Sequence, residues 1–231
     1  MHTDEAVHAS KFGDLLERHS YRYDPYEYHG PTLNYFTLIP AWWSGAHTLQ
    51  EVSERTLRLV PAFFGVALLF VFLLLKKELG STPILLAVFF TAISPAMVFY
   101  SRYYIQEMLL VCFSFTMLIC SWRLVSDGGK GWAMLTGLFL GLMHASKETA
   151  VIPVAAAILA AALVWWYSKP AWRLKPANLG WMIAAAVLTS VLFFSSRTKT
   201  IIIKKAKNMA CCCVSEKLDM SSPSPKTANR K

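Results

Sequence analysis

Residues 132–167 read WAMLTGLFLGLMHASKETAVIPVAAAILAAALVWWY, and the charged side chains within these 36 residues are Lys147 and Glu148. As one straight α-helix this stretch would measure about 54 Å, because a helix rises about 1.5 Å per residue. The hydrocarbon core of a bilayer is only about 30 Å thick. The chain is therefore predicted to turn back near Lys147 and to cross a membrane twice here, the first crossing being short.

The composition of the whole chain also indicates a membrane protein. Hydrophobic residues make up 55% of the sequence and charged residues 16%, with a mean hydropathy of +0.40. Soluble domains carry about 25% charged residues, so this chain has too few of them to cover a water-soluble surface. We expect an all-α fold, a polytopic bundle of transmembrane helices.

The apolar residues fall into six segments that are interpreted as spans. They lie at about 57–75, 83–100, 105–124, 132–146, 149–167 and 179–196. A shorter apolar stretch, PTLNYFTLIPAWWSGA (31–46), contains Pro40 and several aromatic residues, which suits an amphipathic helix in the membrane interface. The expected regions are an outer segment at 1–56, a transmembrane bundle at 57–196 and a low-complexity basic tail at 197–231.

The net charge of +9 comes mainly from the tail. Residues 197–231 hold 9 of the 23 Lys and Arg residues and 2 of the 14 Asp and Glu residues, a net of +7. The remainder of the chain is close to neutral, which argues against nucleic acid as a partner. Membrane lipids are the expected surroundings of the bundle.

Basic residues between the spans predict the orientation, because cytoplasmic connections are enriched in Lys and Arg. Three alternate connections together hold seven basic and two acidic residues; the basic ones are Lys76, Lys77, Arg123, Lys130, Lys169, Arg173 and Lys175. The opposite ends, SRYYIQE (101–107) and HASKET (144–149), hold one basic residue each. These ends, and residues 1–56 with them, are predicted to lie on the extracytoplasmic face of the cell membrane.

Ionisable residues gather at the predicted outer ends, in MHTDEA (1–6), SRYYIQE and HASKET. Charged groups at such depths are costly and mark functional sites by default. The alternative interpretation is that they are solvated ends of spans. The aromatic residues at span ends, Tyr103 and Tyr104 among them, are typical of an interfacial belt, and Gly137 and Gly141 predict close helix packing.

The order of the motifs resembles the GT-C membrane glycosyltransferases of the protein O-mannosyltransferase and aminoarabinose-transferase type, close to the flippase-activity-associated or Rgt-like branch. The motifs are MHTDEAVHA (1–9), YDPYEYHGPTLNYF (23–36), RLVP (58–61), ISPAMVFYSRYYIQEM (93–108) and GLMHASKET (141–149). Members of that family have a span before the acidic pair, further spans and a soluble C-terminal portion. On this comparison the chain is expected to be a form shortened at both ends.

The resemblance implies transfer of a sugar from a polyprenyl-phosphate carrier to an acceptor on the outer face. An attacking hydroxyl needs a carboxylate as general base, and the leaving phosphate needs Arg or Lys beside it. By match to the family, Asp4 is expected to be the base, with Glu5 as its partner or a metal ligand, and Glu107 is the second acidic position. For these acids, the alternative is a structural role at a helix N-terminus.

The remaining candidates are expected to bind substrate. Arg102 and Lys147 are the candidates for the phosphate, although either side chain could simply extend to the lipid headgroups. His144 lies one helical turn before Lys147 and is expected to face the same cavity, while Glu27 and His29 match a polar loop of the family. Oxygen and imidazole ligands could hold a divalent metal ion, but no spacing here is a metal signature.

Two other function classes stay open at this point. A non-catalytic subunit of a lipid-linked sugar flippase, or a transporter, would favour charges at mid-membrane depth and inverted repeats. The sequence shows no such repeat, and its ionisable groups lie at span ends. A catalytically inactive relative is the other alternative, against which the joint presence of Asp4, Arg102, Glu107 and Lys147 argues.

Overall fold

The regular structure is entirely helical in the part of the chain that the computed structural model describes, residues 3–18, 21, 29–168 and 176–195. The α-helices are α1 (Thr3–Arg18), α2 (Thr32–Trp43), α3 (Glu54–Phe72), α4 (Lys76–Leu79), α5 (Ser81–Ile93), α6 (Pro95–Ser101), α7 (Glu107–Ser126), α8 (Lys130–Ser146), α9 (Val151–Ser168) and α10 (Pro176–Phe194). Short 3-10 turns are η1 (Leu49–Glu51), η2 (Leu73–Leu75) and η3 (Glu148–Ala150). The predicted all-α class is confirmed.

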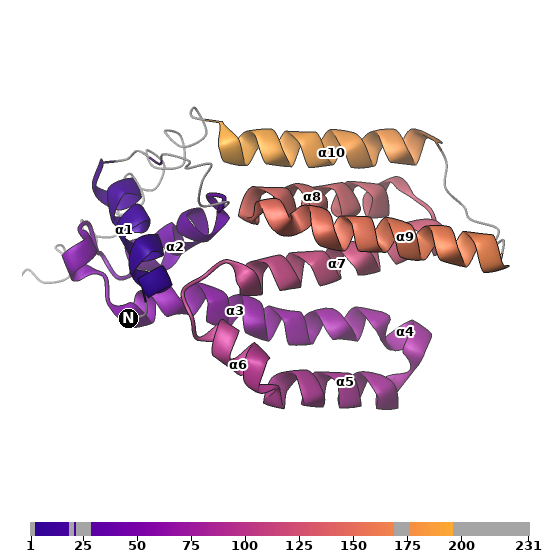
Figure 1. The fold of residues 1–231 in the computed structure, drawn as a ribbon, viewed down its shortest axis with the longest axis horizontal. Coiled ribbons are helices and arrows are strands. Elements are labelled where there is room, and N and C mark those ends of the chain that lie inside the picture. Colours follow the sequence, from indigo (N-terminus) through magenta and orange to yellow (C-terminus); the bar gives the residue numbers. More distant parts are fainter. Residues whose placement is uncertain (1–2, 19–20, 22–28, 169–175, 196–231) are drawn as a thin grey trace, which may run out of the picture.

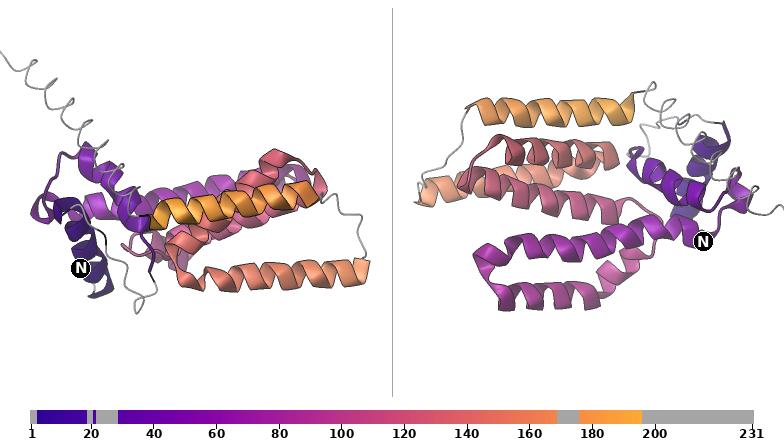
Figure 2. Two further views of the ribbon diagram at one scale, coloured as in Figure 1. Left: turned by 90° about the horizontal axis from the view of Figure 1, so that it is seen from above. Right: turned by 180° about the vertical axis from the view of Figure 1, so that it is seen from behind.

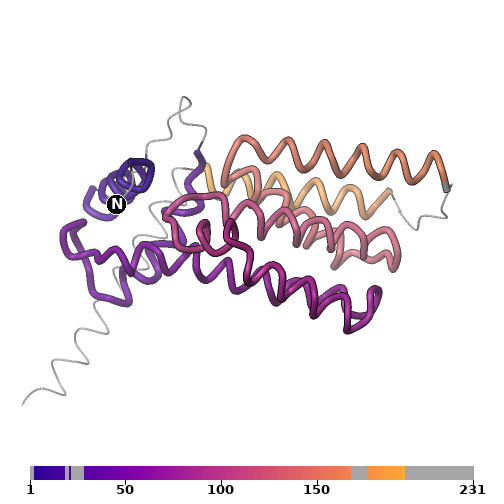
Figure 3. Tube along the Cα trace, turned by 60° about the horizontal axis from the view of Figure 1, so that its bottom comes forward, coloured from indigo at the N-terminus to yellow at the C-terminus, as the bar shows by residue number. Residues whose placement is uncertain are grey.

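The long helices run side by side along the longest axis of the molecule (Figure 1). Helices α1 and α2 lie together at one end of them, as the tube in Figure 3 also shows. The starts of α3 and α7 and the end of α8 reach this same end, which we call the α1–α2 end. The opposite end carries α4 and the connection from α7 to α8 (Figure 1).

Four helical segments are long and apolar enough to cross a membrane: Glu54–Leu79, Glu107–Ser126, Glu148–Tyr167 and Pro176–Phe194. The pair α5 and α6 makes a fifth if the two are one span. By these criteria of length and composition, the described residues contain four or five of the six predicted spans. Helix α8 has 17 residues and rises about 26 Å, which is short for a hydrocarbon core of about 30 Å.

The segment predicted as one span at 83–100 is broken in the structure. Helices α5 and α6 meet at an angle of 63°, and Ser94 between them is extended, with φ −62° and ψ 121°. The cause is Pro95, because a proline disfavours helical geometry in the residue before it and lacks an N–H for the helix. The break shortens both helical pieces and turns α6 toward α3.

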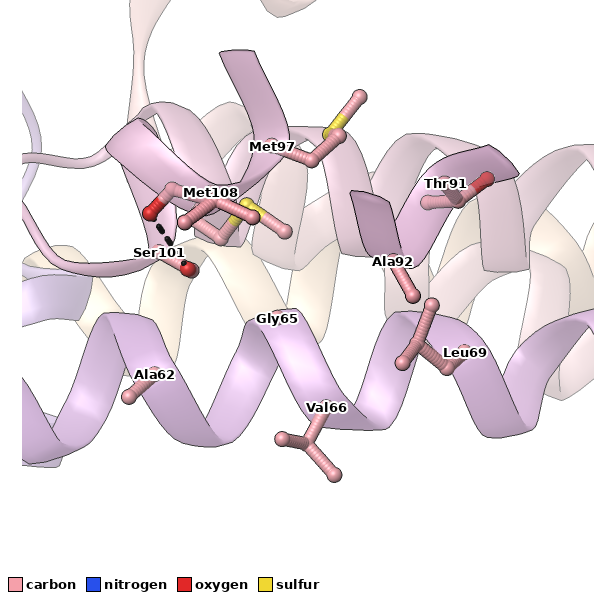
Figure 4. Close-up of a pocket in the computed structure, with 10 residues that line it drawn as sticks. Ala62, Gly65, Val66, Leu69, Thr91, Ala92, Met97, Ser101 and Met108 are labelled. Carbon is pink, nitrogen blue, oxygen red and sulfur yellow. Dashed lines mark hydrogen bonds between the residues drawn. The ribbon is translucent and has the colours of Figure 1, made fainter. Parts of the chain in front are cut away.

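A cavity of about 230 Å³ lies where α5 and α6 face α3 and α7 (Figure 4). Small residues let the helices approach there: a Cβ placed on Gly65 would lie 2.8 Å from the Cβ of Ser101. Ser101 donates a hydrogen bond to the Val98 carbonyl within α6, at 2.9 Å. The cavity is lined by apolar groups apart from the hydroxyls of Thr91 and Ser101.

The predicted turn at Lys147 is confirmed. Helix α8 ends at Ser146, Lys147 is extended with φ −156° and ψ 142°, and the chain continues through η3 into α9. Helices α8 and α10 pack closely at Gly137 and Gly141, the two glycines that were predicted to allow close helix packing. A Cβ on Gly137 would run into the Met182 carbonyl, and one on Gly141 would lie 2.6 Å from Thr189 Cβ.

Helix α9 stands apart from the other long helices (Figure 2). Only 6% of its apolar window is buried by the rest of the described chain. By contrast, α2 is packed into the core through Leu33, Tyr35, Leu38 and Ala41. Helix α2 continues past Pro40 to Trp43, and its position in the membrane interface stays a prediction.

Candidate functional site

Glu5 is the most strongly held acid at the α1–α2 end. Its side chain is 1% exposed. Arg58 of α3 donates to both carboxylate oxygens, from Nε to Oε1 at 3.2 Å and from Nη2 to Oε2 at 3.1 Å. The backbone N–H of Tyr104 donates to Oε1 at 2.9 Å. The carboxylate therefore ties α1 to α3 and to the loop before α7.

These contacts favour the structural alternative for Glu5 over its expected role as partner of Asp4 or metal ligand. Both of its oxygens already accept hydrogen bonds, and the side chain is closed off from solvent. A buried carboxylate with a two-pronged Arg partner and a backbone donor is well satisfied. Its geometry suits a residue that fixes the position of its neighbours. The adjacent Asp4, by contrast, is exposed.

Negative charge converges on Tyr103, in the loop between α6 and α7. The pKa of the Tyr103 phenol is raised, first by removal of water and then by nearby carboxylates. Those carboxylates are Asp4, Glu5 and Glu107. The three acids predicted as catalytic therefore all act on the pKa of one phenol, although they come from two separate helices. The Tyr103 ring is itself stacked on Phe99, with ring centroids 5.2 Å apart.

Glu107 and Lys147, which were assigned different roles from the sequence, contact each other. The Lys147 ammonium donates to Glu107 Oε1 at 2.7 Å. Their side chains are 20% and 32% exposed, for Lys147 and Glu107 respectively. The other oxygen, Glu107 Oε2, is buried and has no hydrogen-bond partner among the residues that the structure describes. Among the described residues, only one oxygen of this carboxylate therefore has a donor.

A seam of backbone contacts places Lys147. His29 and Lys147 form an isolated antiparallel bridge, and the Gly30 N–H donates to the Ser146 carbonyl at 2.9 Å. A Cβ on Gly30 would run into the Ala145 carbonyl. Thr32 adds hydrogen bonds to the Ala145 carbonyl at 2.9 Å and to Ser146 Oγ at 2.8 Å. The segment before α2 therefore fixes the turn after α8.

His29 lies within this seam, with its ring 4.8 Å from that of His8, measured between centroids. Gln106 joins the same region, because its side-chain amide donates to the Gly30 carbonyl at 2.6 Å. Gln106 is 1% exposed and directly precedes Glu107. Through His29 and Gly30, the seam thus connects the segment before α2 with the starts of α7 and η3. The predicted residue Glu27 lies outside the described residues.

The expectation that His144 and Arg102 face the same cavity as Lys147 stays a prediction. His144 is exposed, its ring packs edge-on against Phe194, with centroids 5.7 Å apart, and it lines a cavity of about 450 Å³. That cavity lies between α8, α10 and the start of α9. Arg102 directly follows α6 as its C-cap residue and is exposed.

Two residues of this region had escaped the sequence interpretation. Arg58 was noticed only as part of RLVP, although a charged residue in an apolar span is a functional signal by itself. Tyr104 was assigned to an interfacial belt, and this was wrong. It is fully buried, and its hydroxyl donates to Thr37 Oγ1 at 2.9 Å. No sequence signal pairs Tyr104 with Thr37, which lies 67 positions earlier.

The possibility of a metal site gains no support from geometry. Within the described residues, no group of three or more His, Cys, Asp or Glu side chains is placed to hold a metal ion. Two acids at the α1–α2 end are instead paired with cations: Glu5 with Arg58, and Glu107 with Lys147. A cation released from its pair can hold an anion.

The family model for dolichyl-phosphate-mannose-protein mannosyltransferases matches residues 37–195. No curated protein matches the chain. The matched range contains Arg58, Arg102, Glu107, His144 and Lys147. Asp4, Glu5 and His29 precede it, so their connection with the matched residues comes from the packing of α1 and of the seam described above.

Proposed function

Because the chain belongs to the dolichyl-phosphate-mannose-protein mannosyltransferase family, we propose that it moves a sugar from a polyprenyl-phosphate donor to an acceptor hydroxyl on the extracytoplasmic face. Family and apolar helices together give the general class, a membrane-embedded glycosyltransferase of the GT-C type. The donor, the acceptor and the face are the proposal. The observation that supports it best is the group of Asp4, Glu107 and Lys147 at one end of the bundle.

The proposed reaction needs one base and one anion site. The acceptor oxygen attacks the anomeric carbon of the sugar and forms the new C–O bond. The bond from that carbon to the phosphate oxygen breaks, and its electron pair stays on the phosphate. The acceptor proton passes to a carboxylate, which acts as general base. The leaving phosphate gains negative charge and needs a cation beside it.

Asp4 is the proposed base. Its neighbour Glu5 is occupied by Arg58 and by the Tyr104 N–H, whereas Asp4 is exposed in the first turn of α1. Both acids contribute to the raised pKa of Tyr103, in the loop that leads to Glu107. Glu5 and Arg58 act as positioning residues, because they hold the first turn of α1 against α3.

Lys147 is the proposed partner of the donor phosphate, with Arg102 as a second cation at the same end of the bundle. The backbone of Lys147 is fixed by the bridge to His29, while its side chain remains partly exposed. A point charge on a flexible stem suits a phosphate that arrives and leaves. The extracytoplasmic position of this end is supported by the basic residues Lys76, Lys77, Arg123 and Lys130 at the other end.

The test is a transfer assay on the full chain in lipid vesicles. The probe is a polyprenyl-phosphate mannose labelled in the sugar, presented with a membrane extract that supplies hydroxyl acceptors. The expected result is movement of label from the lipid fraction to the acceptor fraction, with equal release of polyprenyl phosphate. Label that crosses the vesicle membrane while still attached to its lipid would instead identify a flippase, and would overturn the proposal.

A further inference from the structure

The two ion pairs at the α1–α2 end, Glu5 with Arg58 and Glu107 with Lys147, differ in how many hydrogen bonds their carboxylates accept. Glu5 is 1% exposed and both of its oxygens have donors. Glu107 is 32% exposed, only Oε1 has a donor, and Oε2 is buried without a hydrogen-bond partner among the described residues. A buried oxygen without a donor is costly. The pair of Glu5 and Arg58 is therefore expected to stay closed, whereas the pair of Glu107 and Lys147 is expected to open more easily.

The backbone around the second pair is fixed, which leaves the side chains as its movable parts. Lys147 is held by the bridge to His29, and the preceding residue, Ser146, accepts hydrogen bonds from Gly30 and Thr32. Gln106, directly before Glu107, is held through the Gly30 carbonyl. The Lys147 ammonium can leave Glu107 by rotation of its own four-carbon stem, without any movement of a helix.

We propose that Glu107 is a placeholder for the donor phosphate: it occupies the Lys147 ammonium in the empty site, yields it to the phosphate, and takes it back when the product leaves. This inference rests on the proposed function, since it needs a phosphate at Lys147. The carboxylate oxygen and a phosphate oxygen are both strong acceptors for an ammonium group. Glu107 is a positioning residue in this scheme, and acts through Lys147.

The charge of the ligand changes during the proposed reaction in a way that makes such a competitor useful. The donor is a phosphodiester with one negative charge, and the product is a phosphate monoester that carries up to two. Lys147 alone would therefore hold the product more firmly than the donor. A carboxylate that competes for the ammonium weakens both, and allows the product to leave. Release of product often limits turnover in enzymes.

The effect on affinity is expected to be moderate. A partly exposed ion pair is weak, and a site that is partly occupied by an internal competitor binds its ligand less tightly by that fraction. Removal of the Glu107 charge is therefore expected to tighten phosphate binding about three- to tenfold. A structural role for Glu107, in which it orients Lys147 for the ligand, predicts the opposite sign.

The experiment measures equilibrium binding of a polyprenyl phosphate to the full chain in lipid nanodiscs. Glu107→Gln is expected to lower the Kd about three- to tenfold, and Glu107→Asp, which keeps the charge, to leave it near the wild-type value. The matched control is Glu78→Gln. Glu78 pairs with Arg123 at 3.0 Å, with exposures of 26% and 14%, at the opposite end of the bundle, and its loss is expected to change nothing.

Further arms of the experiment identify the source of the effect. Inorganic phosphate should compete with the lipid if the headgroup alone is recognised, and neutral polyprenol should show no gain with Glu107→Gln. In a Lys147→Ala background, Glu107→Gln should no longer tighten binding. In the transfer assay, Glu107→Gln should show stronger inhibition by added polyprenyl phosphate than the wild type.

The outcomes separate the inference from the proposed function. If polyprenyl phosphate binds equally well to wild type and to Lys147→Ala, the assignment of the phosphate to Lys147 is wrong, and the placeholder fails with it. If binding depends on Lys147, but Glu107→Gln leaves the Kd unchanged or raises it, the placeholder alone is overturned. A thermal unfolding midpoint for each folded variant, compared with Glu78→Gln, excludes loss of structure as the cause.

Discussion

The carboxylate of Glu5 and the guanidinium of Arg58 form a two-pronged pair across 53 positions of sequence, with hydrogen bonds of 3.2 and 3.1 Å. The pair joins the first turn of α1 to α3. The Tyr104 N–H completes the shell around the carboxylate. The acidic pair Asp4–Glu5 is therefore divided by its surroundings into one exposed carboxylate and one enclosed carboxylate.

Arg58→Ala is expected to lower the free energy of unfolding by about 2–4 kcal/mol, because it leaves the Glu5 carboxylate buried without a counter-ion. Arg58→Lys should recover only part of this, since an ammonium cannot make the two-pronged contact. Chemical unfolding in detergent micelles measures both. Arg55→Ala, at an exposed arginine one turn earlier, is the control, and an equal loss in that variant would contradict the assigned role of the pair.

Asp4→Asn is expected to reduce sugar transfer by roughly 10²–10⁴-fold, the usual contribution of general acid–base catalysis. Binding of the lipid donor should change little, since Asp4 acts on the acceptor. The control is Asp14→Asn on the same helix, where the exposed Asp14 carboxylate pairs with the exposed Arg18. Transfer at the wild-type rate in Asp4→Asn would remove Asp4 from the mechanism.

Gly30→Ala is expected to destabilise the seam between the segment before α2 and the turn after α8. The added Cβ meets the Ala145 carbonyl, so the bridge between His29 and Lys147 must open or shift. A loss of about 1–3 kcal/mol in unfolding free energy is expected, as for other overpacked sites. Gly180→Ala, where a Cβ meets open space, should instead be neutral or slightly stabilising, because alanine favours helix.

Gly141→Leu is expected to separate α8 from α10. The Thr189 Cβ and the Ala186 carbonyl lie 2.6 and 2.7 Å from a Cβ built on this glycine, which leaves no room for a longer side chain. A lower thermal midpoint is the measurement, with Gly131→Ala on the same helix as the comparison, since that position is open. Similar midpoints for the two variants would mean that the helix contact is not needed for stability.

The orientation in the membrane is tested by labelling single cysteines with an impermeant reagent, after replacement of the native cysteines. Thr48→Cys, at the α1–α2 end, is expected to react from outside intact cells. Lys77→Cys, at the opposite end, should react only after permeabilisation. Both positions are exposed. The reverse pattern would place the candidate site on the cytoplasmic side.

Much of the fold could be predicted from hydropathy and length. The all-α class and the turn at Lys147 follow from apolar runs that are too long for one crossing. Hydropathy detects the apolar residues of 83–100 but does not reveal the 63° break that Pro95 causes between α5 and α6. The short crossing predicted at 132–146 corresponds to α8, which has 17 residues.

The candidate site was less predictable, because ion pairing depends on distances that tertiary packing sets. Sequence reasoning gathered Glu107 and Lys147 at one end but assigned them separate tasks, whereas the structure joins them at 2.7 Å. Arg58, a charged residue in an apolar span, is the feature of the sequence that could have indicated its pair with Glu5. Tyr104 had the pattern of an interfacial residue. Its burial depends on tertiary packing, in which its hydroxyl donates to Thr37 of α2.

The isolation of α9 has a consequence for how the chain enters a bilayer. A helix satisfies its backbone hydrogen bonds internally, so it can exist in lipid without protein neighbours. Only 6% of the apolar window of α9 is covered by the rest of the described chain. Contact with lipid, and not with other helices, is therefore expected to stabilise α9 in a membrane. Its insertion is then a separate event that precedes assembly. A polar substitution at the exposed Leu159 or Leu163 should therefore impair integration at the translocon, and leave the unfolding energy of the remaining bundle almost unchanged.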